Sequence, residues 1–175
     1  PRFNPFFIPK MISDITPGHI SIKHNLRGPN FATVSACASS THALIDAFNY
    51  IRLGKADFMI AGGSEAAVCE AGVGGFNAMH ALSTNNENPE SASRPFDKTR
   101  DGFVIAGGGG VLVLEEYEHA KARGAQIYAE LTGYGATSDG YDMVAPSGEG
   151  AVRCMKMALA TAKNKIDYKT ISSFI

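Results

Sequence analysis

Hydrophobic and polar positions alternate along this chain in patterns typical of helices that follow short strands. The clearest helical pattern spans about residues 39–53, where apolar residues recur every three or four positions. Its apolar stripe consists of four residues: Ala43, Ala47, Tyr50 and Ile51. Ser39 and Ser40 are suited to cap the start of this helix, and Gly54 is suited to end it.

Two further segments carry weaker helical patterns. Residues 148–163 predict an amphipathic helix, and its inward face consists of four residues: Val152, Met155, Leu159 and Ala162. Residues 11–26 place isoleucines loosely on one face, and we expect Pro17-Gly18 to kink or split that helix.

Short apolar runs between these segments predict strands. We expect buried strands over residues 31–36 and 57–63, strands broken by glycines over 103–116, and a strand that ends in a loop over 126–140. The polar stretch 84–102 predicts a loop. Strands that alternate with helices favour an α/β fold with mainly parallel strands.

Nineteen glycines cluster beside apolar segments, which indicates turns and close backbone packing instead of a flexible linker. Residues 72–83 predict a glycine-rich turn that runs into a short helix. The run 106–110 could suggest a phosphate loop, but such a loop leads into a helix and this run leads into the strand-like VLVLEE. Close packing is therefore favoured here.

Charge and composition exclude several classes of protein. Sixteen basic and 17 acidic residues give a net charge of −1 and no basic run, so we expect no nucleic-acid binding. Three widely spaced cysteines favour a reducing, cytoplasmic setting over a disulfide framework. The histidines show no metal-binding spacing, and no apolar run is long enough for a membrane span. The opening PRFNPFFIPK does not read as a signal peptide.

Cys37 is the first candidate for chemistry because it lies where a predicted strand turns into a helix. The helix N-terminus favours a thiolate, the backbone N–H of Cys37 is able to face an oxyanion, and small neighbours such as Ala36 leave room for a thioester. A packed core thiol is the alternative. His42 lies five positions later, about 140° around the helix, which favours a structural or surface role.

Two other residues have a plain structural interpretation beside a functional one. Phe76 follows a glycine-rich stretch and fits either a core or the wall of an apolar tunnel. Asp139 stands in SDG, where an aspartate is commonly a turn residue.

Long segments of the chain resemble the β-ketoacyl-acyl-carrier-protein synthases, the elongating condensing enzymes of the thiolase-like superfamily. The resemblance covers nearly the whole chain and mixes type I and type II features. Six segments carry it, in order: VSACASS, MIAGGSEAAV, GVGGFNAMHALST, SRPFDKTRDGFV, VLVLEEYEHAKARGAQIYAEL and GYGATSDGYDMVAPSGEG.

The resemblance implies a fold and a set of site residues. The fold is the layered α-β-α-β-α architecture, present only in part, with residues 1–125 from the first thiolase-like half and 126–175 from the second. Cys37 matches the acyl-accepting nucleophile, and Phe76 matches a position near the acyl pocket. Phe7 matches a segment near the dimer interface that helps wall the neighbour's tunnel, and Asp139 matches an acid near the active-site water network.

The implied activity is a decarboxylating condensation in fatty-acid elongation. An acyl group passes from the phosphopantetheine thiol of acyl-carrier protein to Cys37, and malonyl-carrier protein then loses CO₂ and attacks the acyl-enzyme. The enzymes of this family are homodimers without an organic cofactor. The family's two catalytic histidines are expected after residue 175, so we expect this chain alone not to condense. A non-catalytic remnant, or a structural partner of an intact synthase, is the alternative, and a polyketide-type ketosynthase is a third option.

Overall fold

The computed structural model describes residues 2–162 of the chain, which mix helices and strands as expected for an α/β protein. Within these residues the backbone divides into two compact units. Unit 1 comprises residues 2–32 and 62–112, and unit 2 comprises residues 33–61 and 113–162. The seam predicted near residue 125 between two thiolase-like halves stays a prediction, and part of its second half lies outside the described residues.

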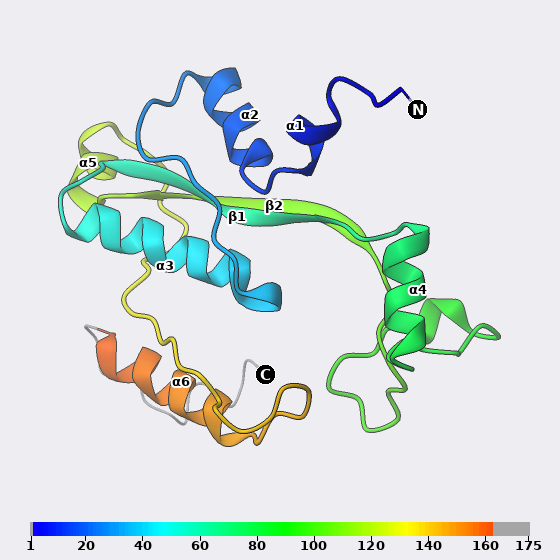
Figure 1. Cartoon of the computed structure of the whole chain (residues 1–175). Helices are drawn as coiled ribbons and strands as arrows, with labels where there is room; N and C mark the ends of the chain where they lie inside the picture. The colour runs from blue at the N-terminus through cyan, green and yellow to red at the C-terminus, as the bar shows by residue number, and fades with distance from the viewer. Residues whose placement is uncertain (1, 163–175) are drawn as a thin grey trace. The chain divides into compact units, whose positions relative to one another are not determined.

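Two strands, β1 (Phe58–Ala66) and β2 (Gly107–Glu115), pair into a two-stranded sheet (Figure 1). The pair is antiparallel. The carbonyl of Asp57, just before β1, accepts from the backbone N–H of Glu116, just after β2, at 2.8 Å. At the other end, Gly107 lies against the carbonyl of Glu65. The expectation of parallel strands is wrong for this pair, because hydrophobic periodicity does not determine the direction of a strand.

The glycines of the sheet explain part of the glycine clustering. A Cβ on Gly62 would lie 2.1 Å from the carbonyl oxygen of Gly110 and 2.7 Å from Cα of Val111, so the strands approach too closely there for any side chain. The run 107–110 begins β2 and does not precede a helix, as predicted. Close packing is not general along it, since a Cβ on Gly108 or Gly110 would meet nothing within 4 Å.

Unit 1 holds the helices α1 (Phe7–Met11) and α2 (Ile15–His24). The helical segment is interrupted over residues 12–14, so the break predicted at Pro17-Gly18 is wrong. Pro17 is the third residue of α2, where the backbone N–H has no intrahelical acceptor in any helix. A proline at that position costs no hydrogen bond.

Unit 1 also holds α4 (Glu70–Ala78) and the short 3₁₀ helix η2 (Pro89–Ser91). The glycine-rich stretch predicted as a turn lies inside α4, which begins directly after Cys69. The predicted polar loop is confirmed over most of residues 84–102, with η2 as its one helical turn in the described chain. Near its ends, Leu82 and Phe103 form a parallel bridge.

Unit 2 contains η1 (Ala36–Ala38), which runs directly into α3 (Ser39–Arg52). This confirms the clearest helical prediction. The end of α3 is fixed by two backbone bonds of 2.9 Å, from Gly54 to the carbonyl of Ile51 and from Lys55 to that of Tyr50. Gly54 has φ +65°, a conformation that glycine adopts without strain.

The last two helices of unit 2 are α5 (Tyr117–Ala122) and α6 (Glu149–Thr161). The inward face predicted for α6 is partly wrong, because Val152 and Met155 are about half exposed, at 46% and 55%. The side of α6 that carries Cys154 lies against residues 133–135 instead. A Cβ on Gly135 would lie 2.1 Å from the carbonyl oxygen of Cys154.

The strands predicted over residues 31–36 and 126–140 are absent from the described structure. The second segment contacts helices instead. The ring of Tyr134 packs edge-to-face on Phe48 of α3, with 5.7 Å between ring centroids, and its hydroxyl lies 3.1 Å from Nδ2 of Asn49. The backbone N–H of Tyr134 donates to the hydroxyl of Thr161 in α6 at 3.0 Å.

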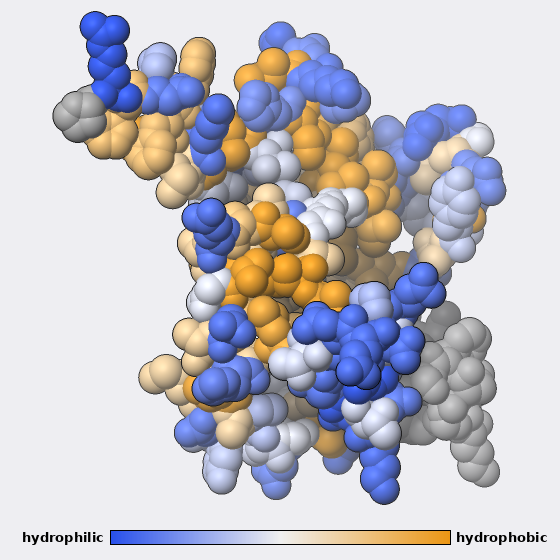
Figure 2. All heavy atoms as spheres, turned by 90° about the vertical axis from the view of Figure 1, so that its right-hand side faces the viewer, coloured by the Kyte–Doolittle hydropathy of each residue, from blue (hydrophilic) through white to orange (hydrophobic). Residues whose placement is uncertain are grey.

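Few apolar side chains are enclosed within residues 2–162. The buried hydrophobic residues are all alanines: Ala47, Ala61, Ala92 and Ala120. Large apolar side chains lie at the surface, as the hydrophobic areas in Figure 2 show. None of the helices in this part of the chain has the length and apolar character needed to cross a bilayer.

Candidate functional site

Cys37 is the middle residue of η1, at the entry to the 14-residue helix α3, and its side chain is exposed. No backbone carbonyl in residues 2–162 accepts from the N–H of Cys37. An N–H without a backbone acceptor beside the thiol is suited to stabilise an oxyanion.

The turn that presents Cys37 depends on an unusual backbone conformation at Ala36. Its φ is +49°, in the left-handed region, where an alanine is strained by about 1–2 kcal/mol. Ser35 before it is extended in φ at −155° and has ψ 44°. This sharp change of direction directly before a helix resembles the turns that expose a nucleophile in other enzymes, although no strand precedes it here.

Short hydroxyl side chains brace this turn. The hydroxyl of Ser39 accepts from the backbone N–H of Ser35 at 2.9 Å and donates to the carbonyl of Ala36 at 2.7 Å. The hydroxyl of Thr33 donates to the carbonyl of Ser39 at 2.7 Å. Ser39 was predicted to cap α3, but it is the first residue of the helix and bonds backwards to the turn.

The side chain of His42, the fourth residue of α3, contacts this turn. Its Nδ1 lies 2.5 Å from the hydroxyl oxygen of Ser35, and both residues are half-buried. The helical spacing of the sequence did not reveal this contact, because Ser35 precedes the helix and has no place in its periodicity. Neither Ser35 nor Thr33 was singled out from the sequence.

Asp139 is half-buried in unit 2 and bonds to the turn before α6. Its carboxylate accepts from the hydroxyl of Ser147 at 2.6 Å and from the backbone N–H of Ser147 at 2.9 Å. These two bonds, with the charge of Arg153, lower the pKa of Asp139 below its usual value. Arg153 in turn donates to the carbonyl of Ser138 at 2.8 Å. These contacts fit the plain interpretation of Asp139 as a turn residue.

Phe76 and Phe7 belong to unit 1, and each leaves much of its ring exposed. Phe76 of α4 is 39% exposed and packs edge-to-face on Phe103, with 5.9 Å between centroids. Phe7 opens α1, is 45% exposed and lies 5.8 Å from the ring of Phe3. Both present apolar surface. Ala36 and Cys37 are neighbours in unit 2, whereas Phe76 and Phe7 both belong to unit 1.

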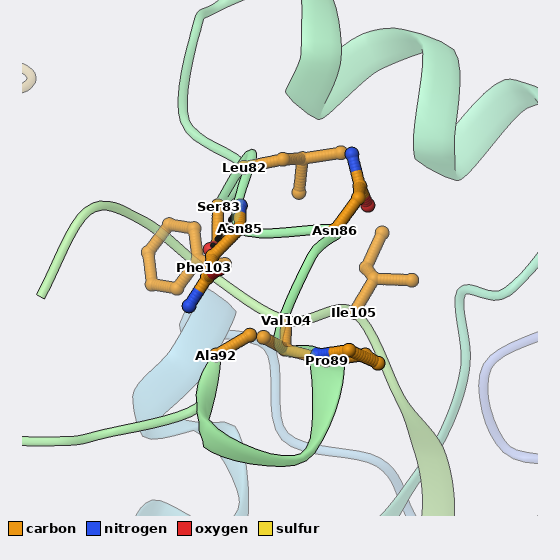
Figure 3. Close-up of a pocket in the computed structure, with 9 residues that line it drawn as sticks. All are labelled: Leu82, Ser83, Asn85, Asn86, Pro89, Ala92, Phe103, Val104 and Ile105. Carbon is orange, nitrogen blue, oxygen red and sulfur yellow. Dashed lines mark hydrogen bonds between the residues drawn. The ribbon is translucent and has the colours of Figure 1, made fainter.

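A pocket of about 190 Å³ lies in unit 1, between residues 82–92 and residues 103–105 (Figure 3). Polar side chains of Ser83, Asn85 and Asn86 line it together with apolar ones such as Phe103. None of the predicted site residues lines this pocket. Among residues 2–162, no group of three or more metal-ligating side chains lies together.

Comparisons with known proteins identify the family. The profile described as "Beta-ketoacyl synthase, N-terminal domain" matches residues 2–120. The "3-oxoacyl-[acyl-carrier-protein] synthase 2" of Rhizobium meliloti (strain 1021) is 54% identical over 164 residues, which cover 92% of this chain and 39% of that protein. The chain thus spans about two fifths of the length of this relative.

Solved structures that resemble this chain are ketosynthases as well. A β-ketoacyl synthase from Burkholderia phymatum STM815 matches with a TM-score of 0.85 and 42% identity, over 91% of this chain and 39% of that one. A type II PKS acyl-carrier protein in complex with its ketosynthase bound to the hexaketide matches with a TM-score of 0.86 and 38% identity, over 95% and 41%. These matches confirm the predicted thiolase-like α/β fold class, present in part. The chain belongs to the β-ketoacyl synthase family.

Proposed function

We propose that this chain carries the nucleophile of a 3-oxoacyl-[acyl-carrier-protein] synthase, and that Cys37 accepts the acyl group. The observation that carries the proposal is the exposed thiol of Cys37 at the start of α3, presented by the strained turn at Ala36. The activity that relatives such as the Rhizobium meliloti protein are named for requires such a nucleophile.

The proposed acyl transfer exchanges one thioester for another. The Sγ atom of Cys37 forms a bond to the acyl carbonyl carbon, and the bond between that carbon and the sulfur of the carrier breaks. The proton of the Cys37 thiol passes to the released carrier thiol. The backbone N–H of Cys37 stabilises the negative charge that develops on the carbonyl oxygen. Because both ends of the exchange are thioesters, the equilibrium is nearly balanced.

The proposed substrates and partners follow from the same family. The acyl donor is acyl-carrier protein, and the condensation partner is malonyl-carrier protein. A carrier protein bound to a structurally similar ketosynthase supports this assignment. In this proposal Phe76 lines the acyl pocket, Phe7 lies near a homodimer interface and Asp139 lies near the active-site water, in a cytoplasmic enzyme.

Mass spectrometry of the intact protein after incubation with an acyl-carrier protein that carries a medium-length acyl group tests the proposal. We expect one acyl group on the peptide that contains Cys37, and no adduct in Cys37→Ala. Cys69→Ala and Cys154→Ala are matched controls and should be acylated like the wild type. Cys69 is also exposed, whereas the thiol of Cys154 lies 3.1 Å from the carbonyl of Gly135.

Two results would contradict the proposal. An adduct that persists in Cys37→Ala would place the nucleophile elsewhere. A folded wild-type protein that takes up no acyl group would favour the non-catalytic partner instead. Circular dichroism of each variant confirms that the comparison is made between folded proteins.

A further inference from the structure

We infer that His42, acting through Ser35, is a positioning residue that holds the Cys37 thiol in its reactive direction. This inference rests on the proposed function, because it assigns a role within the same site. It goes beyond that function by naming two residues that do not contact the acyl group but determine how fast Cys37 accepts it.

Ser35 is fixed through all three of its polar groups. Its N–H donates to the hydroxyl of Ser39 at 2.9 Å, and its carbonyl accepts from the N–H of Ala38 at 3.0 Å. Its hydroxyl lies 2.5 Å from Nδ1 of His42. The first two bonds reach no further than Ser39, the first residue of α3. Only the bond to His42 ties the Ser35 side chain to the body of α3.

That bond matters because the residue after Ser35 is strained. Ala36 has φ +49°, and an alanine leaves the left-handed region unless its surroundings hold it there. Cys37 follows directly, so a relaxation of Ala36 would swing the thiol and its N–H away from the axis of α3. The half-buried contact between Ser35 and His42 opposes this relaxation from the helix side.

His42 acts on Cys37 through Ser35 and not as a general base. Its Nδ1 is already engaged by the Ser35 hydroxyl. His42 is the fourth residue of α3, whereas Cys37 lies before α3, in η1. No hydrogen bond joins the side chains of His42 and Cys37 within residues 2–162.

The geometry of the contact allows a sharp test in the intact protein. An asparagine at position 42 attaches its amide to Cγ, as Nδ1 is attached in histidine, so His42→Asn keeps a polar atom near Ser35. His42→Gln places its amide one bond further out, and His42→Leu removes the polar atom. Ser35→Ala removes the other partner. His24→Leu, at the exposed end of α2, is the matched control.

The measured quantities are kcat and KM for acylation and the rate at which iodoacetamide alkylates Cys37. We expect His42→Leu and Ser35→Ala each to lower kcat by about 10- to 100-fold, the range that misplaced reacting groups cause, with KM almost unchanged. Alkylation of Cys37 should slow several-fold as the thiol leaves the start of the helix. The double variant should be no slower than either single one, because the two residues act as a pair. His42→Asn should restore most of the rate, unlike His42→Gln.

Three kinetic results would overturn the inference: wild-type kcat and alkylation in His42→Leu, equal losses in His42→Asn and His42→Gln, or additive losses in the double variant. A wild-type protein that takes up no acyl group would refute the proposed function instead, and the alkylation rates would still decide the role of His42. A loss that merely followed a lower melting temperature would point to a structural role and also count against the inference.

Discussion

Glu115 is held by Arg123 and His119 together, although it lies at the end of an otherwise exposed strand. Arg123 donates from Nε at 2.7 Å and from Nη2 at 2.6 Å to the two carboxylate oxygens, and Nδ1 of His119 lies 2.6 Å from Oε1. The carboxylate side chain is only 10% exposed. The hydrogen bonds from Arg123 and then His119 lower the pKa of Glu115 from 4.5 to about 2.

This shift predicts a pH dependence of stability. A depressed pKa in the folded state means that the stabilisation from Glu115 is complete above pH 4.5 and is lost as the pH falls towards 2. We therefore expect Glu115→Gln to lower the urea midpoint at pH 7, and the gap to the wild type to shrink between pH 4.5 and 2. Urea unfolding at several pH values measures it.

The control for this prediction is Glu118→Gln in the same segment. Glu118 pairs with Lys121 at 3.3 Å, but the two side chains are 72% and 51% exposed, and such surface pairs contribute little. We expect almost no change in its urea midpoint. A difference in urea midpoint between Glu115→Gln and the wild type that stays constant from pH 7 to pH 2 would contradict the lowered pKa of Glu115.

At the scale of single residues, the sequence predicted the place of Cys37 but not what holds it. The thiol at a turn before a helix follows from small residues beside a strong helical period. The left-handed φ of Ala36 does not, because alanine gives no sign of that conformation as a glycine would. The bonds of Ser35 to Ser39 and His42 span four and seven residues, but Ser35 lies before α3 in a non-helical conformation, so the helical pattern did not point to them.

At the scale of elements, helices whose signals are local in the sequence were predicted better than strands. α3 begins at Ser39 and ends before Gly54 as predicted, because its periodicity and its C-terminal glycine are both local. The strands predicted over residues 31–36 and 126–140 needed partners that residues 2–162 do not supply. The glycine-rich stretch predicted as a turn lies inside α4, although glycine is a poor helix former.

Two glycines with opposite surroundings give a prediction at this scale. Gly62 lies in β1 with the carbonyl oxygen of Gly110 at 2.1 Å from where a Cβ would be, whereas a Cβ on Gly75 in α4 would meet nothing within 4 Å. We expect Gly62→Ala to destabilise the protein by about 1–3 kcal/mol, because the strands must separate. Gly75→Ala should stabilise it by about 0.5–1 kcal/mol through lower chain entropy in the helix.

Urea unfolding in the same buffer measures the free energy of unfolding of both glycine variants. The opposite signs make each variant the control for the other. A Gly62→Ala protein as stable as the wild type would show that β1 and β2 are not so close at this point.

At the scale of the whole chain, apolar surface exceeds what residues 2–162 cover. Val111, Leu112 and Val113 of β2 are 55%, 56% and 61% exposed. Successive residues of a strand point to opposite faces, so both faces of β2 lack cover within these residues. Strands with such continuous apolar runs are normally buried on both sides. The chain also covers only 39% of the length of its Rhizobium meliloti relative, whose remaining residues have no counterpart here.

This surface predicts how the 175-residue chain behaves when it is produced without any further sequence. Exposed apolar patches of this kind bind hydrophobic dyes and drive association. We expect strong binding of anilinonaphthalene sulfonate and elution from a sizing column that shifts to larger species with concentration. The pair Leu112→Lys and Val113→Lys should reduce both dye binding and association, whereas Glu118→Lys, which reverses a charge at a site already 72% exposed, should not. A monomer that binds no dye would show that these residues enclose a sufficient core by themselves.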